Sequence, residues 1–356
     1  MDDVLSAALN SLSGSAAWAL FEVALWDYRN GGDVLAESGR SESEHRLTVA
    51  ARLAPLLDRL LGFDRATAQS ALAMIGQYLP QLYLVAPEWA ERNEEALLAE
   101  GLHDPLSNPT WGTYLLRGGF FDPVFRRLRP WYVRASESMP ATNERPTRDR
   151  RWSVPRALAE HVLVAVVRGL ATVGDSDCLV ETTFRGASSE SKSDVYFDLF
   201  AAWNEPDSKV PPEFVSRLVA FWEWRLAELE AKPRTPESEK EADGFLNFLS
   251  SSYIPSQEAI ALGRRTAQLS SADEHSRPHA WDRLGELAAA DVAGAFEILE
   301  LLVERELKAR FPYLRLERLG PPSAQLSCAR TRRYVRALSS SFIASESEGS
   351  TSLGRC

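Results

Sequence analysis

The chain has 356 residues and a formal net charge of −10. This length is large for one compact core, so the sequence predicts either two domains or an elongated array. A hydrophobic fraction of 45% with ten Trp excludes bulk disorder. The acidic balance argues against a general nucleic-acid-binding protein, which carries a basic surface.

Cysteine usage and hydropathy indicate a cytoplasmic protein. Cys178, Cys328 and Cys356 are too few and too far apart for a disulfide framework or a zinc site, which fits a reducing compartment. The N-terminus opens with acidic residues and does not resemble a secretory signal. The longest apolar stretch, 162–167, is far shorter than the roughly 20 residues that span a bilayer.

Amphipathic helical periodicity runs through the first third of the chain. Residues 15–29 form one predicted helix, which we expect to end at Gly31-Gly32. Residues 44–61 form a second, with Pro55 predicting a kink or a break inside it. The apolar stripe expected in this second helix comprises Leu47, Ala50, Ala51, Ala54, Leu57, Leu60 and Leu61. Further helix starts are indicated by the N-cap residue or first-turn proline at Asp64, Pro87, Asp122 and Ser153.

The second half of the chain continues in the same way. Helices are expected over 213–230 and 242–253, and two more lie within 280–309, separated near Asp291. Two polar stretches, 185–194 and 232–241, interrupt the helical pattern, and the second is expected to join two helices. The predicted domains are an N-terminal helical array over 1–135, a polar Arg-rich linker over 136–152, a C-terminal repeat array over 153–320, and a partly disordered tail over 321–356.

These elements predict an all-α fold of about 14–16 helices with no significant sheet. Because the loops look short, neighbouring helices are expected to be antiparallel. The sequence therefore favours an α-solenoid of HEAT-like helix hairpins, although it shows no strict repeat of 34 or 40 residues. A single irregular helical domain is the alternative.

The sequence predicts no catalytic residue, no metal site and no cofactor. His275 and His279 have the spacing of a helical metal pair, but Pro278 lies between them and no glutamate does. His161 lies in an apolar helix without an identifiable acid or nucleophile partner, so we interpret it as a core or surface histidine. Acidic neighbours should raise the pKa of the Cys178 thiol, which argues against a nucleophile. Gly-rich phosphate motifs and the GxSxG motif are absent from the sequence.

A binding site is expected in the Arg-rich linker. Residues 117–151 hold nine Arg against four acidic residues, and residues 310–336 hold seven Arg against Glu317. Four arginines beside a tryptophan suit a phosphate, nucleotide or acidic-peptide contact, with a solvated linker as the plainer interpretation. The predicted site comprises Arg145, Arg148, Arg150, Arg151 and Trp152. Aromatic residues elsewhere, such as Trp131, Tyr132 and Trp222, are interpreted as core packing.

Three segments carry a resemblance to a known family. WGTYLLRGGFFDPVFRRLRPWYVRA, GFLNFLSSSYIPSQEAIALGRRTAQL and WDRLGELAAADVAGAFEILELLV resemble the C-terminal helical-repeat region of large bacterial anti-phage proteins, the STAND-type NTPases and sirtuin-type NADases. The similarity covers 110–305 and rests on the spacing of aromatic residues and loops. It implies an α-solenoid that recognises a phage component or mediates assembly. The chain carries no NTPase or effector module, and its tail after Leu319 turns Ser- and Arg-rich, so the resemblance transfers no activity and no site residue.

The sequence thus favours a non-enzymatic binding, sensing or scaffold module that belongs to an anti-phage defence protein. The expected partner is a protein, either a phage component or a neighbouring defence module, and no membrane is involved. Two alternatives stay open. One is a nucleic-acid-binding solenoid that uses the two Arg-rich stretches. The other is an irregular all-α enzyme whose site is assembled from distant residues, such as His161 with Cys178 or the arginines of 145–151.

Overall fold

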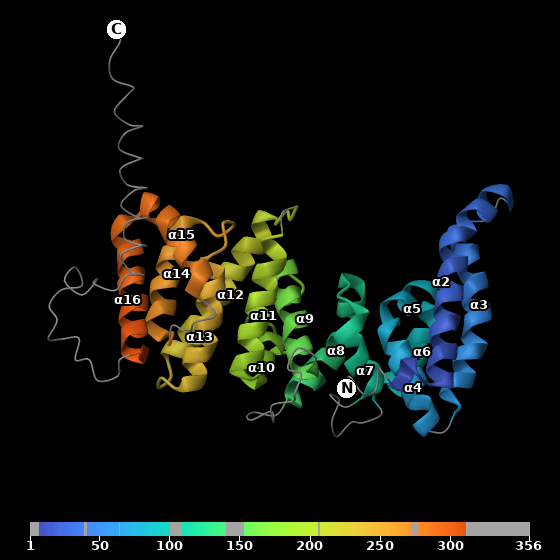
Figure 1. Cartoon of the computed structure of the whole chain (residues 1–356). Coiled ribbons are helices and arrows are strands. Elements are labelled where there is room, and N and C mark those ends of the chain that lie inside the picture. The colour runs from blue at the N-terminus through green and yellow to red at the C-terminus, as the bar shows by residue number, and fades with distance from the viewer. Residues whose placement is uncertain are drawn as a thin grey trace, which may run out of the picture. The chain divides into compact units, whose positions relative to one another are not determined.

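Figure 1 shows the computed structural model of the chain. It describes residues 7–38, 41–63, 65–99, 108–139, 153–205, 207–271 and 277–310. Within these ranges every regular element is helical and no strand occurs, so the predicted all-α class is confirmed. The chain divides into two compact units, Met1–Ser191 and Lys192–Cys356.

The helices of the first unit follow the order of the chain. They are α2 (Leu12–Ser38), α3 (Glu42–Leu61), α4 (Arg65–Gln77), α5 (Leu79–Val85), α6 (Pro87–Leu98), α7 (Pro109–Thr113), the π-helix η2 (Tyr114–Gly118), α8 (Asp122–Glu137), α9 (Val154–Arg168) and α10 (Leu179–Gly186). Most of the packing in this unit is between elements close in sequence, such as α2 with α3 and α4, and α8 with α9 and α10. The predicted N-cap at Ser153 is confirmed, since its side chain accepts a hydrogen bond from the Arg156 backbone N–H.

The expected end of the first helix at Gly31-Gly32 is wrong, because α2 continues to Ser38. Gly31 is needed for packing instead. A Cβ placed there would lie 1.9 Å from Nε2 of His45, on the adjacent helix α3. That imidazole lies 2.9 Å from the backbone carbonyl of Asp27 in α2. A glycine that suggests a helix stop therefore leaves room for the imidazole of the neighbouring helix.

Pro55 does not break its helix either, and α3 runs without interruption from Glu42 to Leu61. The side of α3 that carries Pro55 is exposed to solvent. The carbonyl group four residues earlier, on Ala51, lacks its helical hydrogen-bond donor and can therefore turn towards water. A full capping box starts the helix: the Ser41 hydroxyl accepts from the Glu44 backbone, and the Glu44 carboxylate accepts from the Ser41 backbone N–H at 2.8 Å.

Helices α4 and α7 pack against each other through Gly76. A Cβ at this position would lie 2.2 Å from the backbone carbonyl oxygen of Thr110. Backbone cannot move aside as a flexible side chain can, so only glycine fits this contact.

We therefore expect Gly76→Ala to destabilise the first unit by about 1–3 kcal/mol, the usual cost of overpacking. Chemical denaturation followed by circular dichroism would measure this. Gly62→Ala is the matched control, because its Cβ would meet nothing nearer than 3.5 Å. Equal stability of the two variants would contradict the contact.

The second unit holds the remaining helices. These are α11 (Ser189–Trp203), which begins before the unit boundary, α12 (Pro212–Glu230), α13 (Pro236–Leu249), α14 (Ser256–Leu269), α15 (Arg277–Ala290) and α16 (Val292–Arg310). Its core contains stacked aromatic rings, with Tyr196 and Phe245 at 4.3 Å and Trp222 against Phe245 at 6.0 Å between centroids. Packing of Trp131, Tyr132 and Trp222 in the interior is confirmed, since all three are buried.

The helix boundaries of the second unit confirm some predictions and correct others. The break near Asp291 is confirmed, because α15 ends at Ala290 and the Asp291 carboxylate accepts from the Gly294 backbone N–H at 3.0 Å. The stretch 232–241 is not only a connection. Thr235 and Ser238 form a capping box that starts α13 at Pro236, six residues earlier than expected. In the described part of the chain, no helix combines the length and apolarity that crossing a bilayer requires.

Candidate binding pocket

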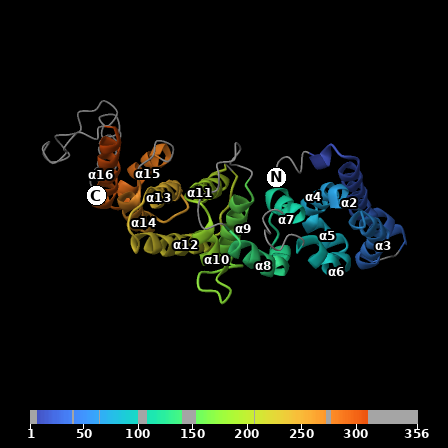
Figure 2. The ribbon, with the colours of Figure 1, turned by 90° about the horizontal axis from the view of Figure 1, so that it is seen from below.

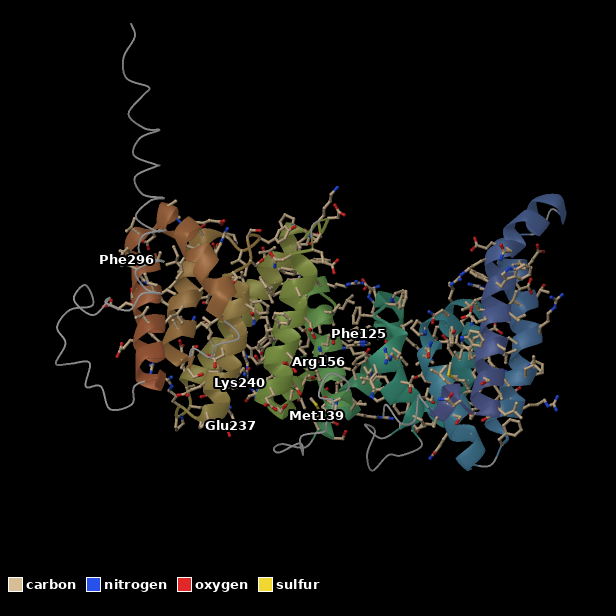
Figure 3. The ribbon with its side chains drawn as sticks, viewed as in Figure 1. Phe125, Met139, Arg156, Glu237, Lys240 and Phe296 are labelled. Atoms are coloured by element: carbon tan, nitrogen blue, oxygen red, sulfur yellow. The ribbon has the colours of Figure 1, made fainter. Side chains whose placement is uncertain are left out.

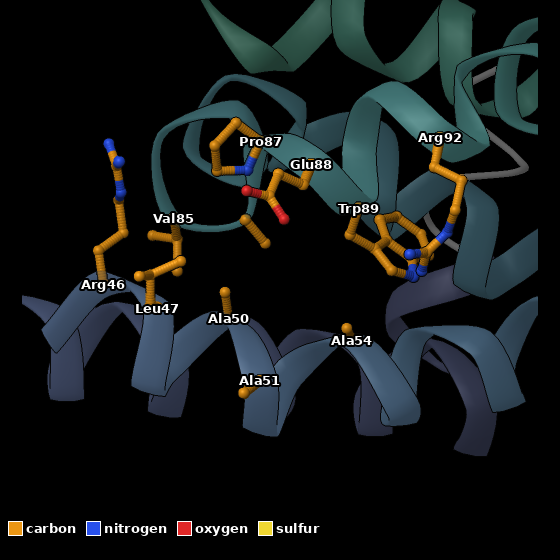
Figure 4. A pocket seen from close by; sticks show the side chains of 11 residues that line it. Arg46, Leu47, Ala50, Ala51, Ala54, Val85, Pro87, Glu88, Trp89 and Arg92 are labelled. Carbon is orange, nitrogen blue, oxygen red and sulfur yellow. The ribbon is translucent and has the colours of Figure 1, made fainter. Parts of the chain in front are cut away.

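The five residues of the predicted Arg-rich site, Arg145, Arg148, Arg150, Arg151 and Trp152, lie outside the described residues. So does most of the predicted linker 136–152. The structure instead shows a cavity of about 240 Å³ in the first unit, between α3 and the junction of α5 with α6 (Figure 4). Figure 2 shows these three helices close together. The cavity is lined by Arg46, Leu47, Ala50, Ala51, Ala54, Val85, Ala86, Pro87, Glu88, Trp89 and Arg92.

The floor of the pocket is the face of α3 that its periodicity predicts to be part of the core. Leu47, Ala50, Ala51 and Ala54 line the cavity, and Leu47 is 55% exposed. The residues that α3 buries are Val49, Leu53, Leu57 and Leu60. The predicted core stripe of α3 is therefore wrong in its first part, because the buried face is rotated away from it. Only Leu57 and Leu60 of the predicted stripe are buried. Leu47 and the three alanines leave a trough about 10 Å long on this side of α3, given a rise of 1.5 Å per residue.

The opposite wall exists because the chain turns sharply between two helices. Ala86 has φ −135° and ψ 59°, outside the helical region, and Pro87 starts α6 at its first position. Val85, Ala86 and Trp89 are buried against the cavity. The Trp89 ring is fixed by a hydrogen bond of 2.7 Å from its Nε1 to the Asp58 carboxylate of α3. This bond joins the two walls of the pocket.

Charged side chains stand at the rim. Figure 4 shows Arg46 at one end of the trough, Arg92 near the other, and Glu88 between them. Arg92 lies 4.0 Å from the Asp58 carboxylate, with 64% of its side chain exposed. An exposed pair at this distance contributes little to folding stability. The charged side chains at the rim are therefore available to pair with charged groups of a ligand.

The size of the cavity decides which class of ligand fits it. Sites for drug-sized molecules and cofactors have volumes of about 300–1,000 Å³. At about 240 Å³ this pocket is smaller and holds one or two amino-acid side chains. A pocket of that size can hold an anchor side chain of a partner protein.

His161 and Cys178, the pair named for a possible enzyme, have different environments. His161 is buried in α9, with Nδ1 2.6 Å from the Tyr132 hydroxyl. Burial lowers its pKa to about 4, so the ring is neutral, although a hydrogen bond to the Leu115 backbone partly opposes this effect. Cys178 is exposed, and its backbone adopts the left-handed conformation (φ 50°) at the start of α10. The interpretation of His161 as a core histidine is confirmed.

Two arginines of the basic stretch 117–151, Arg127 and Arg129, are paired with acidic residues. Arg127 binds Glu94 at 2.9 Å, and Arg129 binds Asp175 at 2.5 Å and Asp177 at 2.6 Å. Three donors, the Trp131 indole, Arg127 and the Tyr83 hydroxyl, converge on Glu94 and lower the pKa of its carboxyl despite partial burial. In the described residues of this stretch, positive charge thus holds α8 to its neighbours.

Metal coordination has no geometric basis in the described ranges, where no three His, Cys, Asp or Glu side chains come together as a ligand set. His275 lies outside those ranges.

In comparisons with protein-family models, curated proteins and solved structures, nothing matches this chain.

Proposed function

We propose that the chain is a non-enzymatic helical-repeat module that binds a segment of a partner protein in the pocket between α3 and the α5–α6 junction. The observation that carries this proposal is the pocket itself, with its alanine floor, its fixed Trp89 wall and its charged rim. The bound segment inserts one aromatic or branched aliphatic side chain. An acidic residue beside that anchor pairs with Arg46 or Arg92.

Stacking as a HEAT-like solenoid belongs to the same proposal. Within the second unit, α12 contacts α14, α13 contacts α15 and α14 contacts α16. Contacts between alternate helices support a series of hairpins in which each helix meets its counterpart in the next hairpin. Such arrays offer long surfaces for protein partners. The resemblance to anti-phage proteins makes a phage component or a neighbouring defence module the partner we propose.

Panning a display library of short peptides against the full chain would test the binding function. We expect selected peptides to carry one large apolar residue next to Asp or Glu. Ala50→Phe fills the floor of the pocket and should weaken their binding by about tenfold or more, a loss of at least 1.4 kcal/mol. Ala96→Phe is the matched control, because Ala96 is exposed on α6 and does not line the pocket.

Arg46→Ala and Arg92→Ala should slow association and reduce its dependence on salt, because rim charges act mainly on encounter. Peptides that bind Ala50→Phe as tightly as the original chain would contradict the pocket as the site. A library that yields no binder would contradict the proposed function. The two alternative functions, nucleic-acid binding and an enzyme assembled from distant residues, have less support in the described residues, where Arg127 and Arg129 are paired with acidic residues and His161 is enclosed.

A further inference from the structure

The outward face of α2 carries an apolar stripe. Exposed residues recur at spacings of four and three along this face: Leu12, Ala16, Ala19, Val23, Trp26 and Asn30. Val23 and Trp26 have 66% and 67% of their surface exposed, and Leu12 has 90%. We call this set the α2 seam. Its alternating spacing is that of the a and d positions of a coiled coil.

The opposite face of α2 accounts for the packing within the chain. Ala17, Phe21, Ala24 and Leu25 are buried, and α2 contacts α3, α4 and α5. The α2 seam is therefore not needed to hold the first unit together. Exposed tryptophan and valine on an otherwise well-packed helix mark a surface that another molecule covers.

We propose that the α2 seam binds the α2 seam of a second copy of this chain, with the two helices antiparallel. Charge placement favours this occupant and this orientation. Glu22 and Arg29 lie one heptad apart on the same edge of the seam, and both are exposed. In an antiparallel pair, Glu22 of each copy faces Arg29 of the other, which gives two complementary contacts. A parallel pair would set Glu22 against Asp27 of the other copy, which are like charges.

Side-chain volumes agree with the same register. Val23 of each copy packs beside Trp26 of the other, and Ala19 leaves room for the polar Asn30. The register is centred between residues 24 and 25, close to the middle of α2 (Leu12–Ser38). A parallel pair would instead stack Trp26 on Trp26 and leave Ala19 facing Ala19.

The contact is small. In this register the seam residues that face each other run from Ala19 to Asn30 of each copy, a length of about 16 Å at 1.5 Å per residue. A single two-helix contact of this length falls below the roughly 1,200 Å² of a stable interface, so the dimer exchanges with monomer. We expect a dissociation constant on the order of 10 µM.

Sedimentation equilibrium of the full chain tests this inference. The original chain should dimerise in that range, and Trp26→Glu should weaken the dimer by at least about tenfold. Phe296→Glu is the matched control: this residue is 50% exposed on α16 (Figure 3), outside the seam, and its substitution should leave the dimer unchanged. A chain that stays monomeric at roughly thirtyfold above the expected constant, or a dimer that Trp26→Glu does not affect, overturns the proposal.

Charge exchange and crosslinking test the orientation. Arg29→Glu should weaken the dimer, and the double variant Glu22→Arg with Arg29→Glu should restore it. In a background with the three native cysteines replaced by serine, a mixture of Ala19→Cys and Asn30→Cys chains should form disulfide-linked dimers. Each variant alone should not, because position 19 faces position 30 of the other copy. Crosslinking of either single variant with itself overturns the antiparallel arrangement.

Discussion

Glu241→Ala should destabilise the second unit by about 3–5 kcal/mol, the cost of removing one partner from a buried ion-pair network. Glu241 is 1% exposed in α13. Its carboxylate accepts from the Arg225 guanidinium at 2.5 and 2.9 Å, from the Lys192 ammonium at 2.5 Å and from the Tyr196 hydroxyl at 3.2 Å. Removing it deprives two buried cations of the carboxylate they share, while burial continues to penalise their charge.

The pKa shifts in this network have one physical origin. Burial alone would raise the pKa of the Glu241 carboxyl, but the charges and hydrogen bonds of Lys192 and Arg225 outweigh burial and lower it. The pKa of the Lys192 ammonium is lowered by burial, and attraction to Glu241 offsets only part of that effect. Attraction to Glu241 therefore reduces the cost of a charged ammonium in the core.

Urea denaturation followed by tryptophan fluorescence and circular dichroism would measure the effect of Glu241→Ala. The matched control is Glu237→Ala, one turn earlier on α13, because Glu237 is exposed (Figure 3) and its loss should change stability by less than about 0.5 kcal/mol. Glu241→Gln keeps the shape but not the charge and should still cost about 2 kcal/mol or more. If the Glu241→Ala chain were as stable as the control, the prediction would be wrong, because Lys192 and Arg225 would then be stabilised by other groups.

The helical class could be read from the sequence because amphipathic periodicity is local information. The helix expected over 213–230 matches α12 within one residue, since its apolar positions and its prolines at the start lie in the same short segment. Gly31 was misinterpreted because its function depends on His45, which a loop brings to it from another helix. Nothing within 15–32 distinguishes a glycine that ends a helix from one that allows close packing.

The pocket was missed for a related reason. Leu47, Ala50, Ala51 and Ala54 look like a core stripe, and periodicity alone does not say which of two adjacent apolar faces is buried. Alanine at three of these four positions did not distinguish the faces, because alanine is common both in cores and on helix surfaces. Which face became the pocket was decided by where the α5–α6 junction packs, and that is not encoded within α3.

Acidification should destabilise the first unit well before ordinary carboxyl groups take up protons. The pKa of His161 is about 4 in the folded chain and about 6.5 in an unfolded one. Between these values the unfolded chain binds the extra proton, so stability falls as the pH falls through this window. The loss reaches about 2 kcal/mol at pH 5 and about 3 kcal/mol near pH 4, from 1.36 kcal/mol per pKa unit. It is absent above pH 6.5, where His161 is neutral in both states.

The experiment is urea denaturation at several pH values between 5 and 8, which stays above the range where carboxyl groups with lowered pKa, such as Asp175 and Asp177, lose their charge. His161→Gln should flatten the pH dependence in this window. Tyr132→Phe is the control: it removes the hydroxyl 2.6 Å from Nδ1 and should lower stability at every pH, yet keep the slope because the buried imidazole remains. If His161→Gln left the slope unchanged, the proton would be taken up elsewhere, and the enclosed imidazole would not be the group that makes the first unit sensitive to acid.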